Sequence, residues 1–220
     1  MSITRSMDLF GHALYNFWKK DKTPIYFTYQ GNKKARSVKR YFRPPSKLSK
    51  LEKKLISLCF GQILDIGCAT GYYIPALMKQ GTVEAIDISP YAVRVANEKG
   101  LNNCHCANIF NFHPNKLYDT ITLFENNLGL GGSIENVEKL LKVIMSLMKP
   151  DGQVLLHQRN ITEPWHKSEL TVEYKGQQET FKWLHISSQK IEEICKQLSL
   201  KFEIIDKGRQ QMYLAKISKS

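Results

Sequence analysis

The amino-acid sequence predicts an α/β fold built on a doubly wound, mostly parallel sheet of seven strands. From residue 62 onward, strand-like apolar segments alternate with amphipathic helical segments, and short glycine-containing turns join them. This order favours right-handed βαβ crossovers, which place successive strands side by side and parallel. After residue 160 the regular alternation of strands and helices ends. The pattern there predicts an inserted hairpin and an antiparallel C-terminal strand.

The first sixty residues follow a less regular pattern. Apolar residues from Met7 to Trp18 recur at the spacing of one helical face, and Ser49 is a candidate cap for a second helix. The elements expected here are a helix at 7–18, a strand at 25–29, a turn at 30–34, an extended segment at 40–45 and a helix at 46–58.

The alternating part of the chain supplies the expected sheet and its helices. Ser89 with Pro90 and Ser133 mark two helix starts, while Gly81 and Gly100 mark two helix ends. The expected strands are 62–67, 82–89, 104–110, 118–126, 151–160, 201–208 and 212–218; the expected helices are 71–81, 90–100, 133–150 and 188–198; and a hairpin turns at Lys175-Gly176.

The length of 220 residues suits a single domain over 1–220, with an extension at 1–45 and a core at 46–220 that carries the 169–184 hairpin as an insertion. No apolar run approaches the roughly 18 residues that span a bilayer, and no signal peptide is evident, so we expect a cytoplasmic protein without membrane contact. Five scattered cysteines fit that location. The Cys104-His105-Cys106 cluster has no second ligand pair, so we expect no metal site.

The net charge of +12 is concentrated in one segment. Between Lys19 and Lys54 there are thirteen Lys or Arg and only two acidic residues. Such a segment attracts anions, whether nucleic acid, an anionic small molecule or an acidic protein. The alternative interpretation is a solvated basic face without a dedicated ligand.

The sequence ILDIGCATGYY, residues 63–73, predicts a nucleotide-binding loop that does not hold phosphate. A P-loop needs Lys-Ser/Thr after its last glycine, whereas Gly71 is followed by Tyr72. The dinucleotide motif has three glycines, and here Gly67 and Gly71 lack the third. Asp65 would repel a pyrophosphate, and therefore indicates a ligand that carries a positive group.

LDIGCATG resembles the first motif of the class I S-adenosylmethionine (SAM) dependent methyltransferases. The only departure is Ala69, which replaces the middle glycine. Asp87 lies twenty residues after Gly67, the spacing at which an acidic residue accepts ribose hydroxyl groups. The resemblance implies a Rossmann-like methyltransferase fold, SAM as cofactor and S-adenosyl-L-homocysteine (SAH) as product. The implied cofactor-binding residues are Asp65, Gly67, Cys68, Ala69, Gly71, Asp87, Ile88, Asn108, Ile109 and Phe124.

The resemblance extends over the rest of the chain. YDTITLFENNLG and LMKPDGQVLL are similar to the fourth-strand and fifth-strand motifs of the family. NNLGLGGS and FKWLHIS further resemble bacterial methyltransferases thought to act on small molecules. At the carboxyl ends of these strands, Glu125 and His157 are the candidate catalytic bases. Their alternative roles are ligand contact or loop capping for Glu125, and a hydrogen-bonded position in the sheet for His157. The candidate substrate-binding residues are Asn126, Asn127, Arg159, Phe17 and Tyr41.

Three functions are compatible with these residues. The first is transfer of a methyl group to an oxygen or nitrogen of a small molecule, with the 7–18 helix and the 169–184 hairpin as a lid. The second is RNA methylation, in which the basic segment binds phosphates and aromatic residues stack on bases; FENN at the fourth strand lacks the [D/N]-P-P-[Y/F] pattern of base N-methylases. The third is a non-catalytic SAM-binding protein, because Ala69 and Asn108 depart from the family pattern. The aromatic candidates for RNA stacking are Tyr26, Tyr29, Tyr41 and Phe42.

Overall fold

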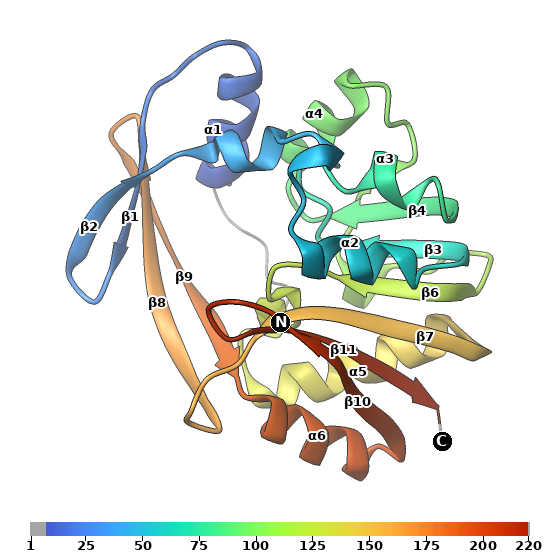
Figure 1. Cartoon of the computed structure of the whole chain (residues 1–220). Helices are drawn as coiled ribbons and strands as arrows, with labels where there is room; N and C mark the ends of the chain where they lie inside the picture. The colour runs from blue at the N-terminus through green and yellow to red at the C-terminus, as the bar shows by residue number, and fades with distance from the viewer. Residues whose placement is uncertain (1–7, 220) are drawn as a thin grey trace.

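The computed structural model describes residues 8–219 (Figure 1). Met7, where the first predicted helix begins, lies outside them. The α-helices are α1 (Leu9–Trp18), α2 (Lys50–Ser57), α3 (Ile74–Leu77), α4 (Pro90–Glu98), α5 (Ile134–Leu147) and α6 (Ser188–Gln197). The strands are β1 (Ile25–Tyr29), β2 (Asn32–Arg36), β3 (Gly61–Ile66), β4 (Gly81–Asp87), β5 (Cys104–Cys106), β6 (Tyr118–Leu123), β7 (Met148–Arg159), β8 (Trp165–Tyr174), β9 (Gln177–Ile186), β10 (Leu200–Lys207) and β11 (Met212–Lys219). Short 3-10 helices form at Val38–Phe42, Pro45–Lys47, Ile109–Asn111 and Asn127–Gly131.

Seven strands form the large sheet in the order β10-β11-β7-β6-β3-β4-β5. Strands β3 to β7 pair in parallel, and β11 is antiparallel to both of its neighbours. The predicted doubly wound α/β fold with an antiparallel C-terminal strand is therefore confirmed. Since parallel pairing directs the carboxyl ends of the strands to one edge, residues that follow β3, β4 and β6 meet there.

Helices cover both faces of the large sheet. On one face, the apolar residues of α5 and α6 pack on side chains such as Tyr118 and Leu156. On the other face, α2, α3 and α4 pack on side chains such as Ile63 and Leu155. Burial on both faces explains why residues 154–156 read as a continuous apolar run rather than an alternating one.

Serine side chains cap several of the helices, as expected for Ser49 and Ser133. The Ser49 hydroxyl accepts the Glu52 amide, and the Glu52 carboxylate accepts the Ser49 amide, which makes a full capping box. Ser133 accepts the amide of Asn136 at the start of α5. These local bonds fix where α2 and α5 begin.

Several predicted elements were wrong in extent or type, among them the 46–58 helix, which begins at Lys50, and the 133–150 helix, which ends at Leu147. The helix expected at 71–81 is reduced to one turn, because Gly71 adopts a left-handed conformation (φ +70°) and the chain passes through turns before α3 begins. The strand expected at 104–110 ends at Cys106, because the Asn108 side chain caps a 3-10 helix. The extended segment expected at 40–45 contains part of the 3-10 helix Val38–Phe42, whose start Ser37 caps.

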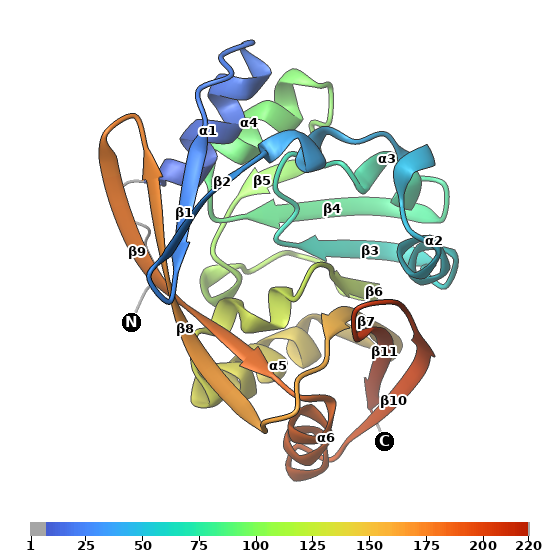
Figure 2. The ribbon, with the colours of Figure 1, turned by 60° about the vertical axis from the view of Figure 1, so that its left-hand side comes forward.

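A second, antiparallel sheet has the strand order β2-β1-β8-β9. We call it the small sheet. It joins the N-terminal extension to the inserted hairpin, because Tyr26–Tyr29 pair with Leu170–Glu173. Figures 1 and 2 show it standing opposite the carboxyl ends of the parallel strands. Helix α1 packs on β8, β9 and α4, with Leu14, Ala92 and Val172 in a shared apolar cluster. The two sheets thus enclose the edge at which the candidate residues lie.

Among residues 8–219, no helix is long and apolar enough to cross a membrane.

Candidate active site

A cavity of about 740 Å3 lies between the carboxyl edge of the large sheet and the small sheet. The large sheet and its loops supply the wall that contains Gly67, Asp87, Glu125 and Arg159. The small sheet, α1 and the 3-10 helix Val38–Phe42 supply a largely aromatic wall. Residues of that second wall include Phe10, Phe27, Tyr29, Arg40, Tyr41, Phe181 and Trp183.

The loop after β3 turns sharply because three of its residues have a positive φ. They are Gly67 (+80°), Ala69 (+49°) and Gly71 (+70°). A Cβ atom on Gly67 would lie 2.3 Å from the side-chain amide of Asn127, so this position requires glycine. The amide of Asn127 donates to the carbonyl oxygens of Ile66 (2.9 Å) and Gly67 (3.2 Å). Asn127, expected on the substrate side, therefore also holds the glycine loop in place.

Asp87, at the end of β4, is bonded to the glycine loop. One carboxylate oxygen accepts the backbone amide of Ala69 at 2.8 Å, and the other accepts the backbone amide of Ser89 at 2.9 Å. Both bonds orient the carboxylate, which lines the cavity. A carboxylate oxygen can accept a further hydrogen bond, and neighbouring ribose hydroxyls are donors suited to it.

Asp65 is fully buried and has an orphaned oxygen. Its Oδ1 atom accepts the hydroxyl of Thr122 at 2.7 Å, whereas Oδ2 has no hydrogen-bond partner. Burial raises the pKa of Asp65 to about 7. A positively charged amino group would satisfy this carboxylate, and SAM carries such an amino group. Asp65 does not itself line the cavity. An amino group in the cavity would therefore interact with this carboxylate across the loop or through a water molecule.

The other expected cofactor residues differ in position. Ile88, Ile109 and Phe124 line the cavity. Cys68 is buried and lies outside the lining. Asn108 lines the cavity, but its side-chain oxygen accepts the amide of Phe110 at 3.1 Å, so it has a structural role besides any contact with adenine.

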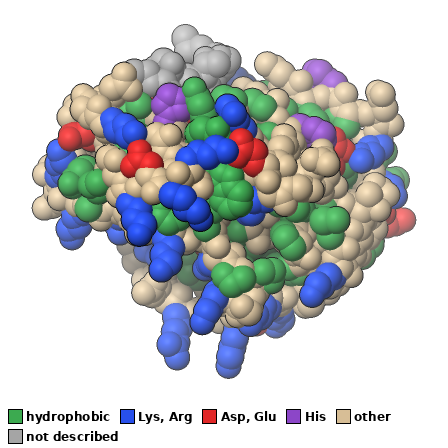
Figure 3. All heavy atoms as spheres, turned by 90° about the horizontal axis from the view of Figure 1, so that it is seen from above, with side chains coloured by type: hydrophobic (Ala, Val, Ile, Leu, Met, Phe, Trp, Pro, Cys, Tyr) green, Lys and Arg blue, Asp and Glu red, His purple; other side chains and the backbone are tan. Residues whose placement is uncertain are grey.

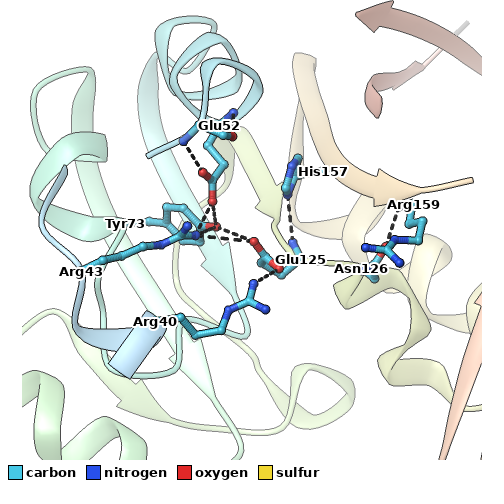
Figure 4. Close-up of polar contacts among 9 residues, drawn as sticks. Arg40, Arg43, Glu52, Tyr73, Glu125, Asn126, His157 and Arg159 are labelled. Carbon is cyan, nitrogen blue, oxygen red and sulfur yellow. Dashed lines mark hydrogen bonds and ion pairs between the residues drawn. The ribbon is translucent and has the colours of Figure 1, made fainter. Parts of the chain in front are cut away.

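Glu125 and Asn126 follow β6 and have left-handed backbone conformations, with φ of 53° and 68°. The amide of Asn126 donates to the carbonyl of His157, and its side-chain oxygen accepts the amide of Arg159 at 2.5 Å (Figure 4). These bonds join the carboxyl ends of β6 and β7. Glu125, Asn126 and Arg159 consequently line one part of the cavity, and their roles toward an acceptor stay a prediction.

Two arginines from the N-terminal extension connect to two glutamates of the core. Arg40 pairs with Glu125, and Arg43 pairs with Glu52 at 2.5 Å and with Glu125 at 3.5 Å. The hydroxyl of Tyr73 donates to Glu52 at 2.5 Å. We call these five residues the arginine-glutamate cluster (Figure 4). Burial alone would raise the pKa of Glu52, but hydrogen bonds from Tyr73 and Ser49 and the charge of Arg43 lower it below its ordinary value.

Glu52, Glu125 and His157 are the described residues that come closest to a metal-binding geometry. Their potential ligand atoms lie within 4.8 Å of one another. Both carboxylates, however, already pair with guanidinium groups, which a metal ion would have to displace. The donor set therefore favours the ion pairs over a cation.

His157 and Phe17 lie outside the lining of the cavity. His157 is buried, its Nδ1 atom accepts the amide of Glu125 at 3.4 Å, and burial lowers its pKa, so the imidazole is neutral at pH 7. Phe17 packs against Phe42, with ring centroids 5.0 Å apart. Phe17 is therefore not part of the proposed site. Tyr41 does line the cavity, and its carbonyl accepts the hydroxyl of Thr70 beside the glycine loop.

Sequence reasoning missed the residues that β8 and β9 contribute. Ser168 and Leu170 lie on one face of β8, and Phe181, Trp183 and His185 lie on the same side of β9. In each strand these residues occupy every second position. That spacing was the available signal, because alternate side chains of a strand point to the same face. Arg40 and Arg43 gave no such signal, since they belong to a run of similar basic residues.

The fold and this site are those of a SAM-dependent methyltransferase. A family model described as a methyltransferase domain matches residues 26–202, and the chain belongs to that family. The residues are compatible with this cofactor, because the oriented carboxylate of Asp87 lines the cavity beside the loop after β3 and the buried Asp65 has an oxygen without a hydrogen-bond partner. SAM is thus the cofactor of this enzyme.

Solved structures share this fold. The chain is 25% identical to a SAM-dependent methyltransferase from Bacteroides fragilis in complex with SAH, with a TM-score of 0.87 over 100% of this chain and 97% of that one. DhpI, in a complex with SAM and HEP, is 16% identical, with a TM-score of 0.67 and 99% of each chain covered. The sugar N-methyltransferase KedS8 from Streptoalloteichus is 10% identical, with a TM-score of 0.60 over 88% of this chain and 97% of that one. A search of curated proteins finds no match.

The basic segment at 19–54 does not form one uninterrupted patch. Within residues 8–219, five of its thirteen basic side chains are paired with acidic residues, namely Lys19, Lys33, Arg40, Arg43 and Lys54. Figure 3 shows Lys and Arg side chains spread over one face, with acidic side chains between them. Phosphate binding by this segment stays a prediction.

Proposed function

We propose that this chain transfers a methyl group from SAM to an oxygen or nitrogen of a small molecule. The observation that carries the proposal is the single cavity that extends from Gly67 and Asp87 to Glu125, Asn126 and Arg159. Its volume lies within the range of about 300 to 1,000 Å3 that is typical of small-molecule sites. The small sheet covers the side on which an acceptor would bind, whereas a nucleic-acid strand needs an open groove.

The similarity to other methyltransferase folds is in keeping with this proposal. KedS8, whose fold resembles that of this chain, is a sugar N-methyltransferase. At 10% identity the likeness concerns the fold alone, so the support comes from the shared architecture and not from shared site residues.

In this proposal the enzyme works mainly by positioning its ligands. SAM supplies an electrophilic methyl group on a sulfonium. Asp87 and Asp65 hold the nucleoside and amino ends of the cofactor, and Glu125 and Asn126 border the acceptor. Aromatic residues such as Phe27 and Tyr41 exclude water from the in-line path.

Glu125 and His157 then have different roles. Glu125 lines the cavity and is the candidate to contact the acceptor or to take up its proton. His157 lies behind it and accepts its backbone amide, so we assign His157 as a positioning residue. Paired substitutions can separate the two roles. Glu125→Gln should lower kcat, whereas His157→Asn, which keeps an acceptor, should retain most of it.

Methyl transfer from tritiated SAM to fractionated small metabolites tests the proposal. Incorporation that requires the wild-type site, and that Asp87→Asn reduces by at least about tenfold at limiting SAM, is the expected result. Incorporation into RNA, with none into small molecules, would contradict it.

The RNA hypothesis has its own test. RNA bound through the basic segment should be released steeply as salt increases, because phosphate contacts displace counterions. Replacing Lys34, Lys39 and Lys47 with Gln should then reduce RNA retention at low salt. If the wild-type protein does not retain RNA at low salt, the hypothesis can be dropped.

A further inference from the structure

Arg159 is a cation in the part of the cavity that the proposed function assigns to the acceptor. It ends β7, lines the cavity, and its backbone amide is held by Asn126. Among residues 8–219, no acidic side chain forms an ion pair with its guanidinium. Arg40 and Arg43 differ in this respect, because both pair with glutamates. A guanidinium at the edge of a partly enclosed cavity favours an anionic partner.

The small sheet places a neutral polar pair in the same cavity. The hydroxyl of Ser168 and the Nε2 atom of His185 lie 2.9 Å apart, and both residues line the cavity. Burial lowers the pKa of His185, and the charges of His166 and Arg159 lower it further. The His185 imidazole is therefore neutral and cannot neutralise Arg159, and the pair offers hydrogen bonds to a bound ligand.

Two cations border a smaller cavity that shares residues with the large one. The smaller cavity, of about 390 Å3, shares Phe27, Tyr29, Arg36 and Leu170 with the large one. Lys34 also borders it. Neither Lys34 nor Arg36 forms an ion pair within the described part of the chain. The smaller cavity therefore carries two cations without ion-pair partners in the described part of the chain, and would attract an anion.

We propose that the methyl acceptor carries an anionic group, a carboxylate or a phosphoryl group, that binds Arg159 next to the Ser168-His185 pair. This inference rests on the proposed function and specifies its substrate class. The anionic group anchors one end of the acceptor on β7, while the nucleophilic oxygen or nitrogen faces Glu125 and Asn126 on the adjacent strand end. The aromatic wall with Phe181 and Trp183 covers the body of the molecule.

Binding of simple aromatic probes to the SAH-loaded protein tests this inference. Benzoate and phenyl phosphate carry the two anionic groups, and benzamide is a neutral molecule of the same shape as benzoate. We expect at least one anionic probe to bind roughly tenfold or more tightly than benzamide, as measured by ligand-observed NMR titration. The anion that binds more tightly identifies the group.

Arg159→Gln should remove this preference while SAH binding is retained, and Arg209→Gln is the matched control. Arg209 is exposed in the turn between β10 and β11, and its substitution should leave the preference unchanged. Equal binding of anionic and neutral probes, a preference that persists in Arg159→Gln, or no probe binding by protein that binds SAH would each overturn the inference. If the wild-type protein does not bind SAH, the result would instead contradict the cofactor assignment on which the proposed function depends.

Discussion

The backbone amide of Ala69 donates a 2.8 Å hydrogen bond to the carboxylate of Asp87, and this bond joins the loop after β3 to the end of β4. The two cofactor motifs are therefore one structural unit. Ala69 is held at φ +49°, a conformation that costs an alanine about 1 kcal/mol. The bond to Asp87 compensates for that cost and explains how alanine occupies the place of the usual glycine.

Ala69→Gly should stabilise the protein by about 0.5 to 1 kcal/mol, because glycine adopts a positive φ without the steric cost of a Cβ atom. Chemical denaturation of the apoprotein measures the change. Ala76→Gly is the control, since Ala76 has a helical conformation in α3, and it should destabilise by about 0.5 to 1 kcal/mol. If Ala69→Gly is destabilising to the same degree, then Ala69 is not strained.

Asp87→Asn should weaken SAH binding by at least about tenfold, because it removes the charge that ribose hydroxyls would contact. Isothermal titration calorimetry gives the affinity. Asp206→Asn, which affects an exposed carboxylate bonded to Lys54 and to the Lys207 amide, should leave it unchanged. Unaltered SAH binding by Asp87→Asn would exclude this carboxylate from the cofactor site.

SAH affinity should increase with pH up to about pH 7 and then level off, because the pKa of Asp65 in the free protein is raised to about 7. Below that pH the carboxyl is protonated in the free protein, and the amino group of the ligand must displace a proton, which lowers affinity by about tenfold per pH unit. Titration calorimetry at several pH values checks the profile. Asp65→Asn should give a flat and weaker profile over this range, and a sloping one would refute the assignment to Asp65.

Arg43→Gln should destabilise the protein by about 3 kcal/mol, since it leaves the carboxylate of Glu52 buried without its ion pair. The Glu52 side chain is only 2% exposed. Arg40→Gln is the matched comparison. The side chain of Arg40 is 51% exposed, and its loss should cost less than about 1 kcal/mol. Urea denaturation of the two variants measures both values, and equal effects would show that Glu52 does not depend on Arg43.

The sequence alone predicts the large sheet, the loop at 65–71 and the position of Asp87, because these depend on local signals. Alternating apolar periods identify strands and helices, and the positive φ values of the loop require small residues. Ser49 and Ser133 likewise mark helix starts by bonds within one turn. The residues on the cofactor side of the site can therefore be predicted from short segments of the sequence.

The part of the acceptor side that the small sheet forms cannot be predicted in this way, because it depends on pairing between distant segments. Strand β1 pairs with β8, about 140 residues further along the chain, and no local pattern specifies that partner. Only this pairing brings Phe27 and Leu170 into the same cavity wall. Arg43 reaches Glu52 and Tyr73 through the tertiary fold in the same manner. His157 was a candidate from its strand position alone, and its burial behind Glu125 becomes visible only in three dimensions.

A crystal structure of the protein with SAH would show whether Asp65 and Asp87 hold the cofactor. We predict that the ribose hydroxyls bind Asp87, the amino end lies next to Asp65, and the sulfur faces Glu125 and Asn126, with the remaining cavity open toward Arg159. SAH bound away from the Asp65 and Asp87 pair, or with its sulfur directed away from Glu125, would contradict the account.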